Sequence, residues 1–166
     1  MPSALGEYFQ DDDGSLPEIE LRFAQPALLV AALEYLFGLP GAYDASRDTA
    51  CVWNLIHDRE EPYRSPQDAR RVASGELAAF HRLLRAAQVD GCVLPDLGVF
   101  VSGEELILDY RMGPQWGESE IVALLRLLAR LRKRGAQVAV PWWGESGERA
   151  FADAIAGIDA GRSAAN

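Results

Sequence analysis

Lysine, histidine and cysteine are scarce in this 166-residue chain, which contains one Lys, two His and two Cys. Zinc sites and nucleophilic dyads depend largely on His and Cys, so the supply for such chemistry is small. Cys51 and Cys92 form no Cys-x-x-Cys pair, and we expect two buried thiols in a reducing compartment. Phosphate-binding glycine loops and nucleophile elbows are also missing, so we expect no cofactor.

Long apolar runs are missing as well. The longest, residues 26–37, is interrupted by Glu34 and is too short to cross a bilayer. Residues 1–6 contain neither a basic residue nor an apolar run, so no signal peptide is expected. Together these features predict a cytoplasmic protein without membrane partners.

Acidic residues are abundant: 25 Asp and Glu face 16 Lys and Arg, for a net charge of −9. An acidic chain repels phosphate backbones, which disfavours nucleic-acid binding. The same charge speeds encounter with basic partners. The preference for Arg over Lys and the many Ala residues suggest a GC-rich bacterial genome.

The apolar patterning predicts one α+β domain over residues 1–160, with an antiparallel or mixed sheet and helices packed on it. Residues 161–166 are expected to be a frayed tail. The element order is ββαβα followed by ββαβα. The predicted strands are 5–10, 19–23, 50–57, 97–101, 105–111 and 137–140. The predicted helices are 26–37, 65–87 with an interruption at Gly75, 119–134 and 148–158.

Several of these interpretations depend on spacing alone. Strands 5–10 and 19–23 are expected to form a hairpin around the acidic turn 11–15. Residues 50–57 carry apolar side chains on both faces, which favours a central strand with Trp53 in the core. Residues 77–87 repeat apolar side chains at helical spacing, which predicts a helix face.

Catalytic and metal chemistry find little support in the sequence. His57, Asp58 and Glu61 are metal-ligand types close together, but successive residues of an extended chain point in opposite directions. His81 lies on a predicted helix distant in sequence. Cys51 and His57 would be about 20 Å apart on one strand. We therefore predict no catalytic and no metal-binding residue, and keep a small metal-dependent hydrolase as the alternative.

Acidic loops and a tryptophan pair are the candidates for partner binding. A turn needs only one Asp beside a Gly, so three successive aspartates suggest contact with a cationic partner; a solvated surface is the alternative. Two adjacent tryptophans point to opposite sides of an extended chain, and an exposed one is a typical interface anchor, which we assign to Trp143; the alternative is that both pack beneath loops at the edge of the core. The predicted partner-binding residues are Asp11, Asp12, Asp13, Glu60, Glu61, Trp142, Trp143 and Glu145.

Two segments carry a resemblance to a known group of proteins. One is Tyr8-Phe9-Gln10-Asp11-Asp12-Asp13-Gly14 with Leu16-Pro17-Glu18-Ile19-Glu20-Leu21, and the other is Leu108-Asp109-Tyr110-Arg111 to Trp116-Gly117 before the Leu- and Arg-rich helix. With helices alternating with strands, the chain resembles the acidic immunity proteins of bacterial polymorphic toxin systems. The resemblance implies a non-enzymatic inhibitor that covers a toxin's active site, which an acidic surface would suit if the toxin is cationic. A structural oligomer subunit is a further alternative, and the sequence leaves the oligomeric state open.

Overall fold

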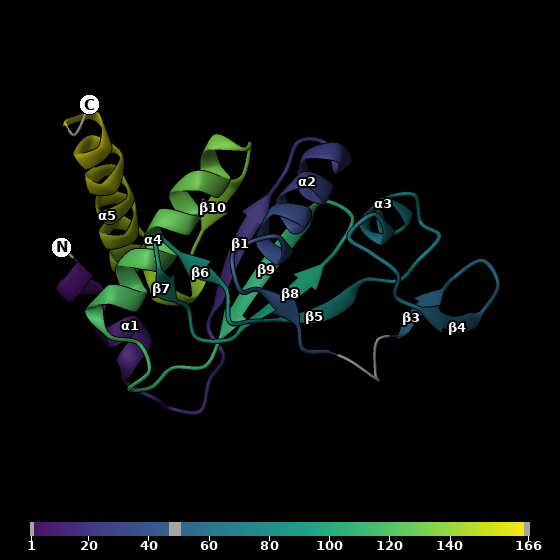
Figure 1. The fold of residues 1–166 in the computed structure, drawn as a ribbon, viewed down its shortest axis with the longest axis horizontal. Helices are drawn as coiled ribbons and strands as arrows, with labels where there is room; N and C mark the ends of the chain where they lie inside the picture. The colour runs from purple at the N-terminus through teal and green to yellow at the C-terminus, as the bar shows by residue number, and fades with distance from the viewer. Residues whose placement is uncertain (1, 47–50, 165–166) are drawn as a thin grey trace.

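The computed structural model describes residues 2–46 and 51–164, with side chains described for residues 4–46 and 51–161 (Figure 1). Its centre is a six-stranded antiparallel sheet in the order β10-β1-β9-β8-β5-β2. The strands of this sheet are β1 (Glu18–Arg22), β2 (Tyr43–Asp44), β5 (Phe80–Arg85), β8 (Leu97–Val101), β9 (Glu105–Tyr110) and β10 (Gln137–Ala139). Two hairpins stand outside it: β3 (Cys51–Asn54) with β4 (Arg59–Pro62), and β6 (Gln88–Val89) with β7 (Cys92–Val93).

Five helices and two 3₁₀ turns complete the described residues. The helices are α1 (Glu7–Gln10), α2 (Pro26–Phe37), α3 (Asp68–Ala73), α4 (Glu118–Lys133) and α5 (Gly144–Ala164), and the 3₁₀ turns are η1 (Pro2–Leu5) and η3 (Pro141–Trp143). The described chain is thus a single α+β domain with an antiparallel sheet, as predicted. α4 carries acidic residues in its first turn and basic residues in its last, which complements the helix macrodipole.

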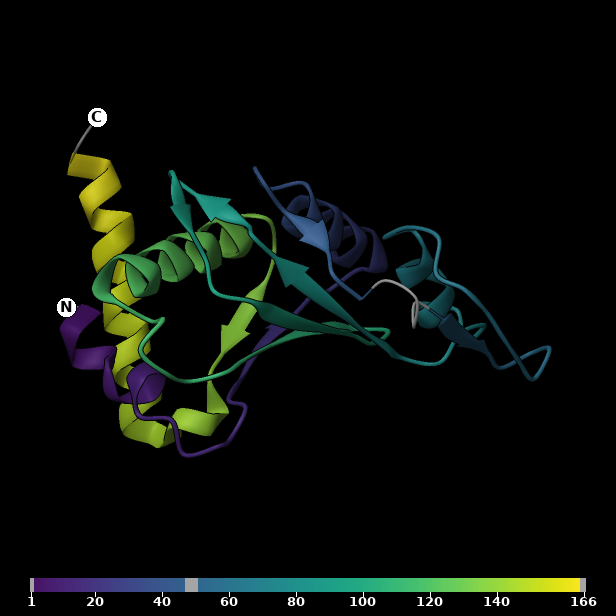
Figure 2. The ribbon, with the colours of Figure 1, turned by 60° about the horizontal axis from the view of Figure 1, so that its bottom comes forward.

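The sheet has one packed face and one face open to water. Along β9, Leu106, Leu108 and Tyr110 are buried, whereas Glu105, Ile107 and Asp109 are only partly covered. This alternation is expected for an antiparallel sheet that packs on its core with one side. α2 and α4 lie over the packed face, and α5 runs beside α4 near the β10 end (Figures 1 and 2).

A smaller unit extends from the β2 end of the sheet, at the right of Figures 1 and 2. We call it the arm; it comprises β3, β4, α3 and residues 74–78. The β3 strand is held on one side by β4 and on the other by residues 76–78, through Leu55 N–H to Glu76 O and Ala78 N–H to Trp53 O. The arm adjoins the sheet through Tyr63, whose ring contacts Phe80 and the Arg82 guanidinium.

Most predicted elements are confirmed, including strand 19–23, helix 26–37, the hairpin 97–111, helix 119–134 and strand 137–140. The first predicted hairpin is wrong, because residues 7–10 are helical. Phe9 is fully buried among the rings of Tyr110, Trp116 and Trp143. Gln10 Nε2 donates to Trp116 O at 2.8 Å. These long-range contacts decide the local conformation.

The predicted helix over 77–87 is also wrong. It begins correctly with α3 but residues 80–85 form β5, in which Phe80, Arg82 and Leu84 face inward while His81 and Arg85 face outward. Its pairing with β8 over five residues supplies the backbone hydrogen bonds that a helix would have provided. The ββαβα repeat therefore does not hold.

Two further predictions differ from the structure. Residues 51–54 form β3 in the arm and not a central strand; residue 50 lies outside the described residues. Helix α5 begins at Gly144 and continues through Ala164, across the predicted start of the tail at residue 161. Residues 165 and 166 lie outside the described part of the chain.

Candidate protein-binding surface

The predicted binding residues fall into two groups at opposite ends of the molecule. Asp11, Asp12 and Asp13 lie in the loop between α1 and β1, on the same end as η3 and the start of α5, which carry Trp142 and Glu145 (Figures 1 and 2). Glu60 and Glu61 lie on β4, in the arm. The structure therefore does not bring these residues into one surface.

The acidic loop has a local structural role. The Asp12 carboxylate accepts a hydrogen bond from Gly14 N–H, and the Asp13 carboxylate accepts one from Ser15 N–H, both at 2.9 Å. The Ser15 hydroxyl and amide lower the pKa of Asp13. Such bonds are typical of Asp in turns. Two of the three aspartates therefore hold the loop itself, a local role for the acidic side chains that differs from the predicted contact with a cationic partner.

The two tryptophans differ in burial, but they lie in the 3₁₀ turn η3 and not in the extended segment that alternation requires, and their predicted roles are reversed. Trp143 is only 7% exposed; its ring stacks on Tyr8 with centroids 4.7 Å apart, and its Nε1 donates to the Tyr110 hydroxyl at 3.1 Å. The assignment of Trp143 as the exposed anchor is therefore wrong. Trp142 is 54% exposed. Trp116, in contrast, is fully buried in the core.

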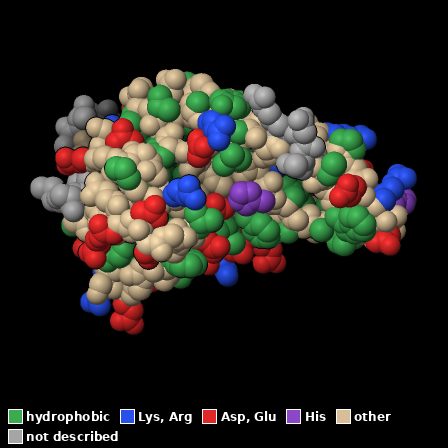
Figure 3. Space-filling view, turned by 90° about the horizontal axis from the view of Figure 1, so that it is seen from below, with side chains coloured by type: hydrophobic (Ala, Val, Ile, Leu, Met, Phe, Trp, Pro, Cys, Tyr) green, Lys and Arg blue, Asp and Glu red, His purple; other side chains and the backbone are tan. Residues whose placement is uncertain are grey.

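An exposed apolar surface occurs on the arm. Within β3, Val52 and Asn54 are buried, so the alternating residues Cys51 and Trp53 face outward. Trp53, Leu55 and Ile56 are 42, 54 and 69% exposed. We call this surface the apolar arm face; it consists of Cys51, Trp53, Leu55, Ile56 and Pro62. Figure 3 shows hydrophobic side chains gathered on the arm, beside acidic and basic ones.

Polar contacts on the inner side hold this face in place. The side-chain oxygen Oδ1 of Asn54 accepts hydrogen bonds from Ile56 N–H and His57 N–H, both at 2.9 Å, and thereby shapes the turn at the tip. Its amide nitrogen donates to the Glu61 carboxylate at 3.0 Å. Buried polar groups that are satisfied in this way specify one conformation. The apolar side chains at the tip are consequently displayed and do not fold back onto the arm.

Arg71 of α3 joins the inner carboxylates of the arm. Its guanidinium contacts Glu61, Asp68 at 3.3 Å and Glu76 at 2.8 Å. The hydrogen bond from Asn54 and the neighbouring Arg71 lower the pKa of Glu61. Glu61 is therefore engaged inside the arm, whereas its predicted companion Glu60 is exposed and lies directly opposite Trp53 in the hairpin.

The open edge of the hairpin is unsuited to strand addition. β4 reads Arg-Glu-Glu-Pro, and charges and proline are the usual means of blocking an edge. A partner is thus expected to contact the face of the hairpin and not its edge.

The expectation that Trp53 lies in the core is wrong. The charged sequence of β4 was the signal that its neighbouring strand lies outside the main sheet.

The arm shows no metal centre. Among the described residues no group of three or more His, Cys, Asp or Glu is placed to hold a metal ion. Glu61 of the alternative ligand set points to Arg71.

Cys51 is an exposed free thiol, contrary to the expected burial, and Cys92 is a partly buried one. No helix within the described ranges is long and apolar enough to cross a membrane.

His81 forms a polar pair on the open face of the sheet. Its Nε2 lies 2.7 Å from Asp109 Oδ2, across Gly98 of the intervening strand β8. A Cβ at Gly98 would meet the Asp109 carboxylate at 2.3 Å, so glycine makes room for the pair. The hydrogen bond with Asp109 raises the pKa of His81.

We expect Asp109→Asn to lower the pKa of His81. The measurement is an NMR titration of the His81 imidazole in a His57→Gln background, in which no second histidine interferes. Because the pKa is raised on folding, the pair contributes stability that is fully present below the ordinary His value, about 6.5. That contribution is lost as the pH rises through the folded pKa. Asp109→Asn should therefore flatten this part of the stability profile. An unchanged His81 midpoint in Asp109→Asn would contradict the pairing.

The chain matches no protein-family model, no curated protein and no solved structure. Its function is therefore inferred from the chemistry of its surfaces.

Proposed function

We propose that the chain is a non-enzymatic protein-binding domain that contacts its partner through the apolar arm face. The observation that carries the proposal is the exposure of Trp53, Leu55 and Ile56 on a hairpin held by internal polar contacts. Burying a fully exposed side chain of this size is worth about 1.5–3 kcal/mol, and each of these three, being about half exposed, would gain about half of that against a partner. Tryptophan is among the residues that most often dominate such interfaces.

Within this class, we propose a cytoplasmic immunity protein that neutralises a cognate bacterial toxin. The resemblance of the sequence to such proteins and the net charge of −9 support a cationic toxin domain as the partner. A narrow arm with an apolar tip suits insertion into a concave site. Glu60, opposite Trp53, and Asp58, at the turn, would contact cationic residues around that site.

The test uses the protein encoded by the neighbouring gene as the candidate partner. The double variant Trp53→Ser, Ile56→Ser should weaken its binding by about 100-fold or more, since two interface anchors contribute at least about 2 kcal/mol each. Co-expression of this variant should also fail to restore growth of cells that produce the partner. Surface plasmon resonance and colony counts provide the two measurements.

Trp142→Ser is the matched control, because Trp142 is exposed to a similar extent at the other end of the molecule. It should bind like the wild type. If the arm variant binds with full affinity while Asp11→Lys binds more weakly, the interface lies at the acidic loop and the proposal is overturned. A partner that shows neither binding nor toxicity would remove the assignment as its immunity protein.

A further inference from the structure

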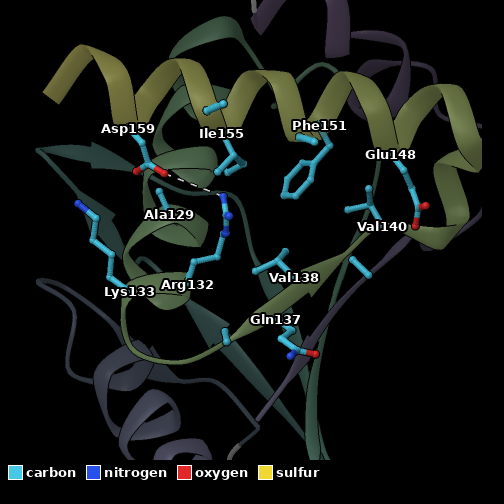
Figure 4. A pocket seen from close by; sticks show the side chains of 14 residues that line it. Ala129, Arg132, Lys133, Gln137, Val138, Val140, Glu148, Phe151, Ile155 and Asp159 are labelled. Carbon is cyan, nitrogen blue, oxygen red and sulfur yellow. Dashed lines mark ion pairs between the residues drawn. The ribbon is translucent and has the colours of Figure 1, made fainter. Parts of the chain in front are cut away.

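A groove of about 800 Å³ lies between α5, β10 and the last turns of α4, far along the chain from the arm (Figure 4). Its lining is mainly apolar, with Val138 and Val140 from the β10 segment facing Phe151 and Ile155 of α5. This volume is in the range of sites that enclose ligands of several residues or rings. The exposed helix residues Ala152 and Ala156 leave the side of the groove open, because alanine fills little of it.

The groove runs along an open sheet edge. β10 is the end strand of the six-stranded sheet, and within the described part of the chain it pairs with β1 alone. Phe23 N–H donates to Glu104 O, and Pro17 O accepts from Tyr110 N–H, so the odd-numbered residues of this stretch hydrogen-bond to the β9 side. The backbone N–H and C=O groups of successive residues in a strand point to opposite sides. The even-numbered residues Glu20 and Arg22 therefore direct their N–H and C=O groups to β10.

The register then determines which β10 groups face the groove. Glu20 pairs with Ala139 and Arg22 with Gln137, so Val138 between them directs its N–H and C=O away from β1. Its side chain shares the face of its partner Leu21, which is buried, and it lines the groove. Val138 therefore offers both the backbone N–H and C=O that point away from β1 and an apolar side chain to a ligand in the groove.

Charges mark the two ends of the groove. Arg132 and Lys133 stand where β10 begins, with Arg132 3.9 Å from Asp159, and Glu148 stands where β10 ends, beside Val140 (Figure 4). An extended segment that is antiparallel to β10 would start beside Glu148 and finish beside Lys133. This orientation suits a segment that is basic at its start and acidic at its end.

We propose that this groove binds an extended peptide segment of a partner protein, which adds to β10 as an antiparallel strand. Backbone hydrogen bonds with Val138 would hold the strand, and apolar side chains at alternate positions would pack against Val138, Ala152 and Ala156, which are accessible apolar residues of the lining. Strand addition beside a helix uses the edge for affinity and the groove for side-chain selection. The site is separate from the apolar arm face and does not depend on its proposed role.

The experiment uses a fluorescein-labelled peptide, Lys-Val-Ser-Val-Ser-Val-Glu, and the full chain. Anisotropy should show saturable one-to-one binding. The amide signal of Val138 should shift in a ¹⁵N spectrum. Ala152→Trp, which fills the groove, should weaken binding at least tenfold. Ala160→Trp is the matched control, since Ala160 is an exposed α5 residue outside the lining, and it should bind like the wild type.

Two altered peptides test the mode of binding. The same peptide with N-methylated central amides should lose at least tenfold in affinity, and the reversed sequence should bind more weakly. Equal binding of the N-methylated peptide would show a merely apolar ligand site and overturn strand addition. Dimerisation of the chain that is abolished by Ala152→Trp would make a second copy the occupant, and would also overturn the proposal.

The groove proposal and the proposal that the apolar arm face binds a partner can fail independently of each other. Trp53→Ser, Ile56→Ser should bind the labelled peptide with wild-type affinity, and Ala152→Trp should leave binding through the arm unchanged. Absence of saturable binding to the wild-type chain at millimolar peptide would overturn the groove proposal alone.

Discussion

Replacing Leu128 with Ala is expected to lower the free energy of unfolding by about 2–5 kcal/mol. Leu128 is fully buried in the middle of α4, within the core cluster that also contains Leu124 and Leu131. The substitution removes three buried carbon atoms and leaves a cavity, because neighbours in a close-packed core relax only partly. Leu125→Ala should behave alike, since Leu125 is buried to a similar degree.

Urea unfolding followed by far-ultraviolet circular dichroism measures this effect. Leu16→Ala is the control, since Leu16 is half exposed in the loop before β1, and its change should stay within about 0.5 kcal/mol. If the urea midpoints of Leu128→Ala and the wild type coincide, α4 is not packed against the sheet as described.

Replacing Arg82 with Met is expected to destabilise the protein by about 3 kcal/mol, the lower part of the range for breaking a buried ion pair. Arg82 is buried on the inner face of β5, where its Nε donates to the Asp44 carboxylate at 2.6 Å. Its guanidinium also lies over the Tyr63 ring, 4.0 Å from the centroid. Methionine fills a similar space but leaves Asp44 charged and only a quarter exposed.

A double-mutant cycle separates the charge from the packing. Asp44→Asn in the Arg82→Met background should recover part of the lost stability, because the uncompensated charge is removed. Arg85→Met is the comparison, since the Arg85–Asp96 pair at 2.9 Å is far more exposed and its loss should matter much less. Strict additivity of the Arg82 and Asp44 substitutions would show that the two side chains do not interact.

The predictions that hold come from strong local signals. α4 combines a buried stripe with charges that match both ends of the helix. The β8–β9 hairpin combines alternating apolar residues with a short turn at Ser102 and Gly103. In both cases local propensity and tertiary packing favour the same structure, so the sequence pattern was sufficient.

The candidate binding surface was only partly visible in the sequence. The exposure of Glu60 agrees with its charge, but which tryptophan of the 3₁₀ turn η3 enters the core depends on Tyr8 and Tyr110, which are distant along the chain. The sequence predicts Trp53 in the core because a strand with apolar residues on both faces is usually buried. Its exposure follows from β3 pairing outside the main sheet.

By itself the sequence determined the α+β class, the acidity, the helices α2 and α4, the β8–β9 hairpin and the strand β10, because each depends on periodicity or composition within one segment. Tertiary structure alone decided that residues 7–10 are helical and that residues 80–85 are a strand. Their apolar spacing satisfied either conformation, and contacts with Trp116 or pairing with β8 selected one. It also decided which apolar side chains of the arm face water, since that depends on what lies across from each strand.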